Sequence, residues 1–317
     1  MKHRFSKITI LLGAALMSAA AANAEHTTLI KYGNFDSWVT RNIPESKILG
    51  GKTKQVYAIG PTSIISGAKP YSPAGGSPWA TSNVMAKVMG VVKASNAVSP
   101  AAHGSGKCAR MVTTMDHIKA AGMVNMDVVV AGTIFLGKML EPVTSTKNPY
   151  SKMEMGIPFT QRPVALTFDY NLSIPKENQR TYSSGFGKKK TVPGLDRAEV
   201  MILLQYRWED ANGNIFAKRV GTGHELLGRS TSGWVNTHRV PINYGNASHV
   251  KPLIPKQKSY YARNSKGKMV PVQEVDWAAP GTAPTHMILM FSSGSGEPYT
   301  GTIGTEFMID NVGLVYS

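Results

Sequence analysis

The sequence predicts an all-β protein built as a two-sheet sandwich or a closed sheet. Several segments alternate apolar and polar residues with a period of two, and none sustains the i, i+3, i+4, i+7 apolar stripe of an amphipathic helix. The 317 residues include 31 glycines and 19 prolines, which suit the many turns of such a fold. Hydrophobic residues make up 42% of the chain and charged residues 17%, so the composition is globular rather than disordered.

The first 24 residues have the pattern of a secretory signal peptide. Three basic residues, Lys2, Arg4 and Lys7, precede a short apolar run, and small residues end the segment at Ala24. The apolar run is too short to span a membrane, and Glu25 stands where a lipid-anchored export signal needs cysteine. We therefore expect a periplasmic or extracellular protein that is not a lipoprotein and has no membrane span, with one domain over residues 25–317.

The period of two locates the strands in order along the chain. Residues 164–172 and 199–208 are the clearest, and in the second of these Tyr206 and Trp208 continue the inward-facing series of Val200, Ile202 and Leu204. Further strands are expected at 28–32, 54–59, 107–114, 123–135, 215–221, 237–242, 286–293 and 306–316. The turn residues Asn212, Gly213 and Asn214 predict a hairpin after Trp208.

Most of the excess positive charge falls in two predicted loops. The formal net charge is +16, and loss of the leader would leave +13. Residues 182–193 and 251–271 are too rich in Gly, Pro and Lys to read as strands, and residues 66–78 read as a further surface loop. Export and the lack of a nucleic-acid motif argue against a nucleic-acid partner, whereas an acidic glycan would be attracted to such loops.

Cys108 is the single cysteine, so an internal disulfide is excluded. It lies in a predicted strand, where a lone thiol is typical of small core filler rather than of a nucleophile.

An ordered set of short motifs resembles the putative carbohydrate metabolism domain family, found mostly in exported proteins of the Bacteroides group. The motifs are NFDSW at 34–38, PWATSN at 78–83, GTIFLG at 132–137, GIPFTQRP at 156–163, LTFDY at 166–170, VPINY at 240–244 and IDNVGLVY at 309–316. The resemblance implies a jelly-roll β-sandwich similar to carbohydrate-binding modules. It departs at Asp36, where the family more often has Glu before Trp, and in the basic loops.

With that resemblance, we expect non-catalytic binding of a poly- or oligosaccharide. Sugar rings stack on exposed aromatic faces and their hydroxyls bind amide and guanidinium groups, whereas Trp208 on its inward face is expected in the core. The candidate binding residues are Trp79, Asn83, Arg110, Arg162 and Trp234. No cofactor is expected. Asn34 and Asp310 are candidates for a structural Ca²⁺, although capping of turns accounts for both more simply.

Two other classes of function remain open. A glycoside-active enzyme of the same fold would need two carboxylates flanking the scissile bond, and Asp169 and Glu306 are the candidates. A structural or surface-assembly protein would show neither sugar binding nor turnover.

Overall fold

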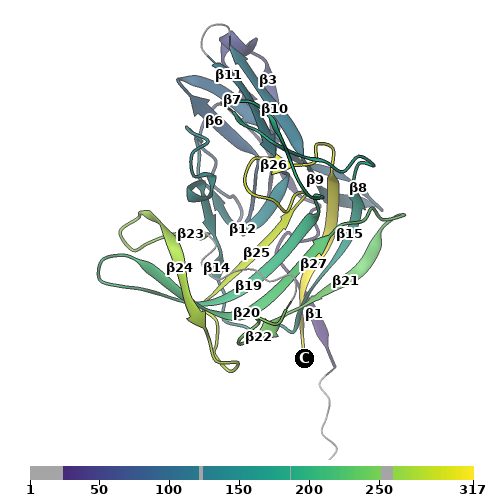
Figure 1. Ribbon diagram of the computed structural model, residues 1–317, viewed down its shortest axis with the longest axis vertical. Coiled ribbons are helices and arrows are strands. Elements are labelled where there is room, and N and C mark those ends of the chain that lie inside the picture. The colour runs from purple at the N-terminus through teal and green to yellow at the C-terminus, as the bar shows by residue number, and fades with distance from the viewer. Residues whose placement is uncertain (1–23, 121–123, 186, 251–259) are drawn as a thin grey trace, which may run out of the picture.

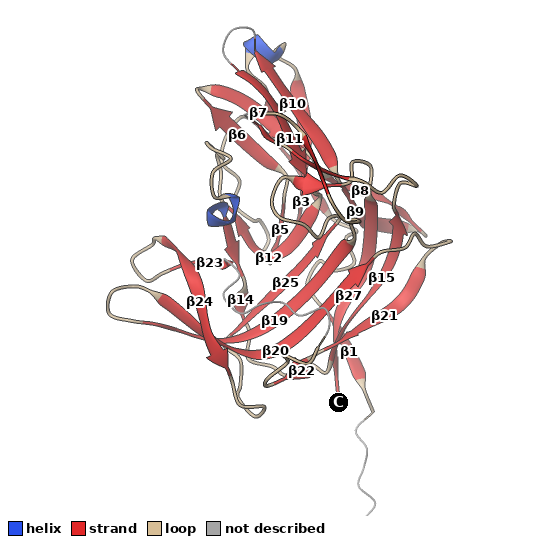
Figure 2. Ribbon diagram, viewed as in Figure 1, coloured by secondary structure: helices blue, strands red, loops and turns tan. Residues whose placement is uncertain are grey.

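The computed structural model describes residues 24–120, 124–185, 187–250 and 260–317, and they form an almost entirely β structure (Figure 1, Figure 2). The described helical segments are two short 3₁₀ turns, η1 (Lys47–Leu49) and η2 (Pro149–Lys152). No helix in this described part is long and apolar enough to cross a membrane. The predicted signal peptide, except Ala24, lies outside the described residues.

The first of two main sheets is antiparallel and runs in the order β21-β15-β27-β9-β8, with β1 also paired to β27. Its strands are β1 (His26–Leu29), β8 (Val98–His103), β9 (Gly106–Val112), β15 (Ala165–Ser173), β21 (Val235–Pro241) and β27 (Glu306–Tyr316). β27 therefore lies in the middle of the sheet and brings both ends of the described chain to one edge of the molecule (Figure 1).

The second sheet contains the longest hairpin, formed by β19 and β20. Its strands are β5 (Trp79–Thr81), β12 (Thr133–Met139), β13 (Met153–Met155), β14 (Ile157–Pro158), β19 (Ala198–Glu209), β20 (Ile215–Leu227), β22 (Asn243–Tyr244), β23 (Tyr260–Arg263), β24 (Met269–Trp277) and β25 (His286–Ser292). The chain crosses repeatedly between the sheets, from β14 to β15, β15 to β19, β20 to β21 and β25 to β27. Such crossing characterises a jelly roll, and the predicted all-β jelly-roll sandwich is confirmed.

The sandwich core lies between these two sheets. Leu166 and Phe168 from β15 and Phe307 from β27 pack against Ile202 and Phe291 from the second sheet, and all five are buried. Phe168 meets Phe291 edge-on, with ring centroids 5.0 Å apart. The faces of β15 and β19 that the period of two assigned to the core do supply it, and most residues on the opposite faces of these two strands are buried as well.

The second sheet also curls back on itself. β25 pairs with both β19 and β12, so the path β12-β13-β23-β24-β20-β19-β25 closes. Its interior contains a second apolar cluster that includes Met201, Leu203 and Tyr260. Beside this cluster lies a buried ion pair in which the Arg219 Nε donates to the Glu274 Oε1 at 2.9 Å, and the Gln205 Nε2 donates to the same oxygen at 2.7 Å.

Smaller sheets form the upper half of the molecule in Figure 1. They contain β2 (Trp38–Pro44), β3 (Thr53–Ile59) and β4 (Ser63–Ser66); β6 (Val84–Val88) and β7 (Val91–Ser95); β10 (Thr114–Ala120), β11 (Val124–Val130) and β17 (Ser184–Gly185); and β16 (Arg180–Tyr182), β18 (Lys190–Val192) and β26 (Thr300–Gly301).

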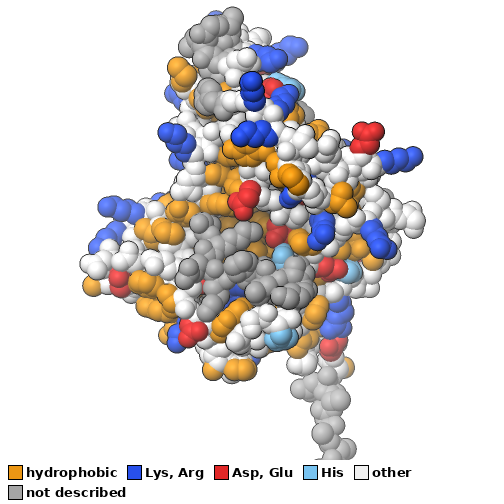
Figure 3. Space-filling model, viewed as in Figure 1, with side chains coloured by type: hydrophobic (Ala, Val, Ile, Leu, Met, Phe, Trp, Pro, Cys, Tyr) orange, Lys and Arg blue, Asp and Glu red, His pale blue; other side chains and the backbone are white. Residues whose placement is uncertain are grey.

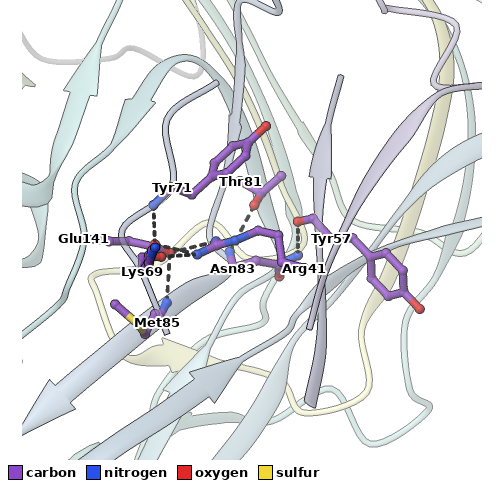
Figure 4. A network of polar contacts seen from close by, with 8 residues as sticks. All are labelled: Arg41, Tyr57, Lys69, Tyr71, Thr81, Asn83, Met85 and Glu141. Carbon is purple, nitrogen blue, oxygen red and sulfur yellow. Dashed lines mark hydrogen bonds and ion pairs between the residues drawn. The ribbon is translucent and has the colours of Figure 1, made fainter. Parts of the chain in front are cut away.

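A buried polar network ties β2 to the start of β6 (Figure 4). The Glu141 carboxylate accepts hydrogen bonds from both Arg41 terminal nitrogens, at 2.9 and 2.6 Å, and from the backbone N–H groups of Tyr71 at 2.9 Å and Met85 at 2.8 Å. Four donors satisfy one carboxylate, so this network stabilises the junction between the strands and the loop that carries Tyr71.

The strands β2, β6, β7 and β8 were not predicted from the sequence, and three predicted segments differ in the structure. Residues 123–135 form two strands rather than one, because Gly132 lies so close to the backbones of Ala97 and Val112 that a Cβ there would clash with both. The predicted loop 182–193 includes β17 and β18. The predicted loop 251–271 includes β23 and the start of β24, and its residues 251–259 lie outside the described residues. Backbone pairing to neighbouring strands, which local composition does not encode, explains the strands in these polar segments.

His286 makes the stability of the closed sheet depend on pH. Burial, with a smaller contribution from the positive charge of Arg207, lowers its pKa from 6.5 to about 4. Between pH 6.5 and pH 4 the imidazole of His286 is therefore protonated in the unfolded chain but neutral in the folded one. The free energy of unfolding should accordingly fall by roughly 1–3 kcal/mol as the pH drops from 6.5 to 4. Urea unfolding at several pH values would measure this loss. The loss of stability at low pH should disappear in His286→Gln but persist in His249→Gln, which changes an exposed histidine. The same dependence of unfolding free energy on pH in wild type and both variants would contradict the prediction.

Candidate functional site

Three aromatic rings form a row on the β19–β20 hairpin, with Tyr206 and Trp208 exposed and Phe216 half-buried, and we call these three residues the aromatic strip. The ring centroids of Tyr206 and Trp208 are 6.2 Å apart, and those of Trp208 and Phe216 are 5.7 Å apart with planes inclined by 22°. Tyr206 is 43% exposed and Trp208 38%. Large aromatic surfaces are usually buried, so a row of rings in which Tyr206 and Trp208 are open to solvent offers apolar area to a ligand.

Polar side chains border the aromatic strip. Lys218 on β20 lies opposite Tyr206 on one side and Asp276 of β24 on the other, while Gln273 lies opposite Phe216. Lys218, Gln273 and Asp276 are all exposed. The surface therefore presents flat apolar faces beside an ammonium, an amide and a carboxylate, which together supply hydrogen-bond donors and acceptors.

The exposure of the strip corrects the prediction that Tyr206 and Trp208 face the core. Val200, Ile202 and Leu204 are fully buried as expected, but the contribution of β19 to the sandwich core ends at Leu204. Beyond that point β19 continues in the same alternation toward its hairpin turn, past the cover of the first sheet. The face that is core at Leu204 is therefore surface at Trp208.

Trp79 is 1% exposed and belongs to the sandwich core, which corrects the expectation that it offers a face to a sugar. Its ring meets Phe35 edge-on at 5.4 Å, and its Nε1 donates to the Lys31 carbonyl at 2.9 Å. Trp79 lies at the start of β5, which pairs with β12 and so turns the side chain inward.

Asn83 is also buried, and its amide serves the backbone rather than a ligand (Figure 4). Its Nδ2 donates to the carbonyls of Tyr57 at 2.8 Å and Val98 at 2.7 Å. Its Oδ1 accepts from the backbone N–H groups of Ala97 and Val98 at 2.8 and 2.9 Å. All four hydrogen-bonding positions of this amide are used, so the expectation of a sugar contact here is corrected.

Arg162 holds a loop in place. Its guanidinium lies 4.0 Å from the Tyr244 ring centroid and donates to the carbonyls of Pro280 and Thr282. Arg162 is exposed, and these contacts use its guanidinium to hold the loop at residues 280–282 beside the segment that leads into β15.

The remaining two candidates lie on the outer face of the first sheet. Trp234 is half-buried and stacks on His103 at 3.7 Å, and the His103 Nδ1 lies 2.5 Å from the Asp310 Oδ2. Burial raises the pKa of Asp310, while the contact with His103 opposes that shift. The Arg110 Nε donates to the Glu306 Oε2 at 2.7 Å in a partly exposed pair. Arg110 and Trp234 therefore keep some accessible surface, away from the aromatic strip.

Asp169 and Glu306 do not form a close carboxylate pair. In the β15–β27 register Asp169 lies opposite Asp310, whereas Glu306 lies opposite Ser173, four residues along the strand. Four residues of strand correspond to about 13 Å, beyond the roughly 5–9.5 Å that glycoside hydrolysis requires. Asp169 also accepts from the Thr237 N–H at 2.6 Å and from the Asn311 amide at 2.8 Å.

Asn34 and Asp310, the candidate calcium ligands, each contact a different side chain of the protein. The Asn34 amide donates to the Asp36 carboxylate at 2.7 Å, and Asp310 contacts His103. Across the residues that the structure describes, no cluster of three or more His, Cys, Asp or Glu could hold a metal ion. Cys108 is a buried free thiol whose pKa burial raises to about 11, in agreement with a core role.

The fold and the surface together define a class, an all-β jelly-roll sandwich with an aromatic strip accessible to ligand. A family model described as "Putative carbohydrate metabolism domain" matches residues 57–246, and the chain belongs to this family. The family predicted from the motifs is therefore confirmed, and the protein contains a carbohydrate-related domain that includes the whole aromatic strip.

Comparison with individual proteins finds distant likenesses. No curated protein matches the chain. A crystal structure of a putative glycoside hydrolase from Bacteroides thetaiotaomicron is 18% identical, with a TM-score of 0.45 over 84% of this chain and 76% of that chain. The crystal structure of a family 28 carbohydrate-binding module specific for non-crystalline cellulose is 11% identical, with a TM-score of 0.28 over 76% of this chain and 90% of that chain.

Proposed function

We propose that the protein is an exported glycan-binding module that recognises a poly- or oligosaccharide through the aromatic strip, without catalysing its cleavage. The observation that carries this proposal is the row of Tyr206, Trp208 and Phe216 on one hairpin, with Tyr206 and Trp208 open to solvent. Membership of a carbohydrate-related family supports the choice of a sugar as the ligand.

The chemistry of the strip suits a chain of sugar rings. Each pyranose has a flat C–H face that packs on an aromatic ring, and successive rings of a glycan would cover successive rings of the strip. Lys218, Gln273 and Asp276 border these faces and would exchange hydrogen bonds with the equatorial hydroxyls. The strands hold the rings in a row before binding, which lowers the entropy lost on association.

The charge of the protein favours an acidic glycan. The net charge is +16, or +13 without the predicted leader, and it comes from the chain as a whole, since Asp276 lies opposite Lys218 in the border of the strip. Long-range attraction of this kind weakens as salt is added, so affinity for an acidic glycan would fall between low and high ionic strength while affinity for a neutral one would change little.

Non-catalytic binding also agrees with the placement of the acidic residues. Asp169 and Glu306 are separated along the first sheet, and Glu306 is paired with Arg110. Neither lies on the β19–β20 hairpin that carries the strip.

Titration of immobilised and soluble glycans, neutral and acidic, against wild-type protein and Trp208→Ala tests the proposal. Loss of the central ring should weaken binding at least tenfold, because burying a large apolar side chain contributes about 1.5–3 kcal/mol. The unfolding midpoint should stay close to that of the wild type, since Trp208 is already partly in solvent. Leu195→Ala, which removes an exposed apolar side chain elsewhere, is the matched control and should bind normally.

Unchanged affinity in both Trp208→Ala and Tyr206→Ala, or no glycan bound at all, would overturn the proposal. Turnover of an oligosaccharide that disappears in Asp169→Asn or Glu306→Gln would favour the glycoside-active alternative. A stable protein partner in the absence of binding and turnover would favour a structural or surface-assembly role.

A further inference from the structure

An apolar cavity of about 270 Å³ lies between the upper half of the molecule and the closed part of the second sheet. β6, β10 and β11 line one side, and β13, β19 and β25 line the other. Figure 3 shows hydrophobic side chains gathered in the hollow between the two halves, with acidic side chains beside them. The cavity opens on the Met201 face of β19, whereas the aromatic strip occupies the other face of that strand.

The walls are rich in methionine. Six of the lining side chains are Met126, Met139, Met153, Met155, Met201 and Met290. Methionine is flexible and polarizable, so such a lining adapts its shape to an apolar guest, as it does in other binding surfaces that accept varied partners. A sugar would leave its hydroxyls without partners against these side chains, which separates the cavity from the glycan surface.

Most polar side chains that line the cavity carry neutral hydroxyl groups, and the charged ones are few. The acidic ones are Asp116, Glu297 and Glu199, and the Glu199 Oε1 lies 2.9 Å from the His224 Nε2. Of the two lysines, Lys93 is paired with Glu45 at 3.1 Å. Burial and the nearby carboxylates raise the pKa of Tyr150 to about 12, so its hydroxyl stays neutral. Ser95 is also among the lining residues, and its buried Oγ has no hydrogen-bond partner within the described residues.

These features define the ligand chemistry. The few charged groups offer no net positive charge to hold an anionic head group, while the apolar walls suit a hydrocarbon chain. The volume is nearly twice that of an apolar cavity that admits benzene, which is about 150 Å³. We propose that the cavity binds the hydrocarbon chain of an uncharged amphipathic molecule, an alkyl or acyl group of roughly eight to ten carbons.

Calorimetric titration of the full chain with butyl, hexyl and octyl β-glucoside, each below its micelle concentration, tests this binding. Each added methylene that enters the cavity should tighten binding by up to about fourfold, so octyl glucoside should bind at least tenfold more tightly than butyl glucoside. 1-Octanol should bind with similar affinity, because the chain and not the sugar is recognised. Octanoate should bind at least tenfold more weakly than 1-octanol. The heat capacity change should be negative.

Ala86→Phe fills the cavity from a half-exposed wall residue of β6 and should weaken binding of 1-octanol at least tenfold. The exposed Ala279→Phe is the matched control and should bind like the wild type. Trp208→Ala should also bind 1-octanol normally, so failure of the glycan proposal and failure of this one are distinguishable. Affinity that is independent of chain length, equal or tighter binding of octanoate, or normal binding by a folded Ala86→Phe protein would overturn the inference. The chain-length series on wild-type protein decides the matter if that variant does not fold.

Discussion

Replacement of Trp79 by alanine is expected to lower the free energy of unfolding by about 3–5 kcal/mol, the range for a fully buried large aromatic side chain. The side chain packs on Phe35 in the sandwich core, and its indole N–H satisfies the Lys31 carbonyl. Removing it leaves a cavity and an unpaired carbonyl together. Urea denaturation, with the midpoint and slope compared with those of wild type, measures the loss.

Trp208→Ala provides the control for Trp79→Ala, because it removes the same side chain from a surface position. It should change the unfolding free energy by less than about 1 kcal/mol while reducing glycan affinity. Trp79→Ala should lower the unfolding free energy but leave glycan affinity unchanged, measured at a temperature where the variant remains folded. A loss below about 1 kcal/mol at Trp79 would contradict its placement in the core.

Glu274→Gln is expected to destabilise the protein by about 3–5 kcal/mol, as removal of one partner from a buried ion pair typically does. Both side chains of the Arg219–Glu274 pair are fully buried inside the closed sheet. Glutamine has nearly the same volume, so the loss would come from the missing charge opposite the Arg219 guanidinium and not from a packing defect. Denaturant unfolding near neutral pH is the appropriate measurement.

Glu306→Gln is the matched control, since it makes the same change in the partly exposed pair with Arg110. Solvent screens that pair, and the expected cost is below about 1 kcal/mol. Similar losses in the two variants would show that the Arg219–Glu274 pair is not held in a dehydrated interior. Replacement of both Arg219 and Glu274 by apolar residues of similar size should recover much of the stability.

The strand pattern of the sequence predicted the core where both sheets cover it. In β15 and in the first part of β19, the face that the period of two assigned to the core is buried between the sheets, and Leu166, Phe168 and Ile202 are core as expected. The same rule failed at Tyr206 and Trp208, because periodicity identifies a shared face of a strand but not how far the opposing sheet extends. The nearness of Trp208 to the hairpin turn at residues 210–214 was the available signal for its exposure.

The candidate binding residues show the opposite error, in which side chains expected at the surface are buried. Turn residues before Trp79 suggested exposure, yet pairing of β5 with β12 turns its side chain into the core. Asn83 looked like a sugar ligand by residue type, but its amide is used by four backbone groups from β3, β8 and the turn before β8. Residue type alone does not distinguish a group that binds ligand from one that satisfies buried backbone.

The sequence by itself determined the all-β class, the main strands, the buried single thiol and the family, since each depends on local alternation, composition or ordered motifs. Tertiary structure alone decided which aromatic rings reach solvent, that Asp169 lies opposite Asp310 and not Glu306, and that six methionines from distant strands line one cavity. The physical reason is that exposure and proximity depend on strand register and on where one sheet ceases to cover the other. Both are set by contacts between residues far apart in the chain, which no local pattern records.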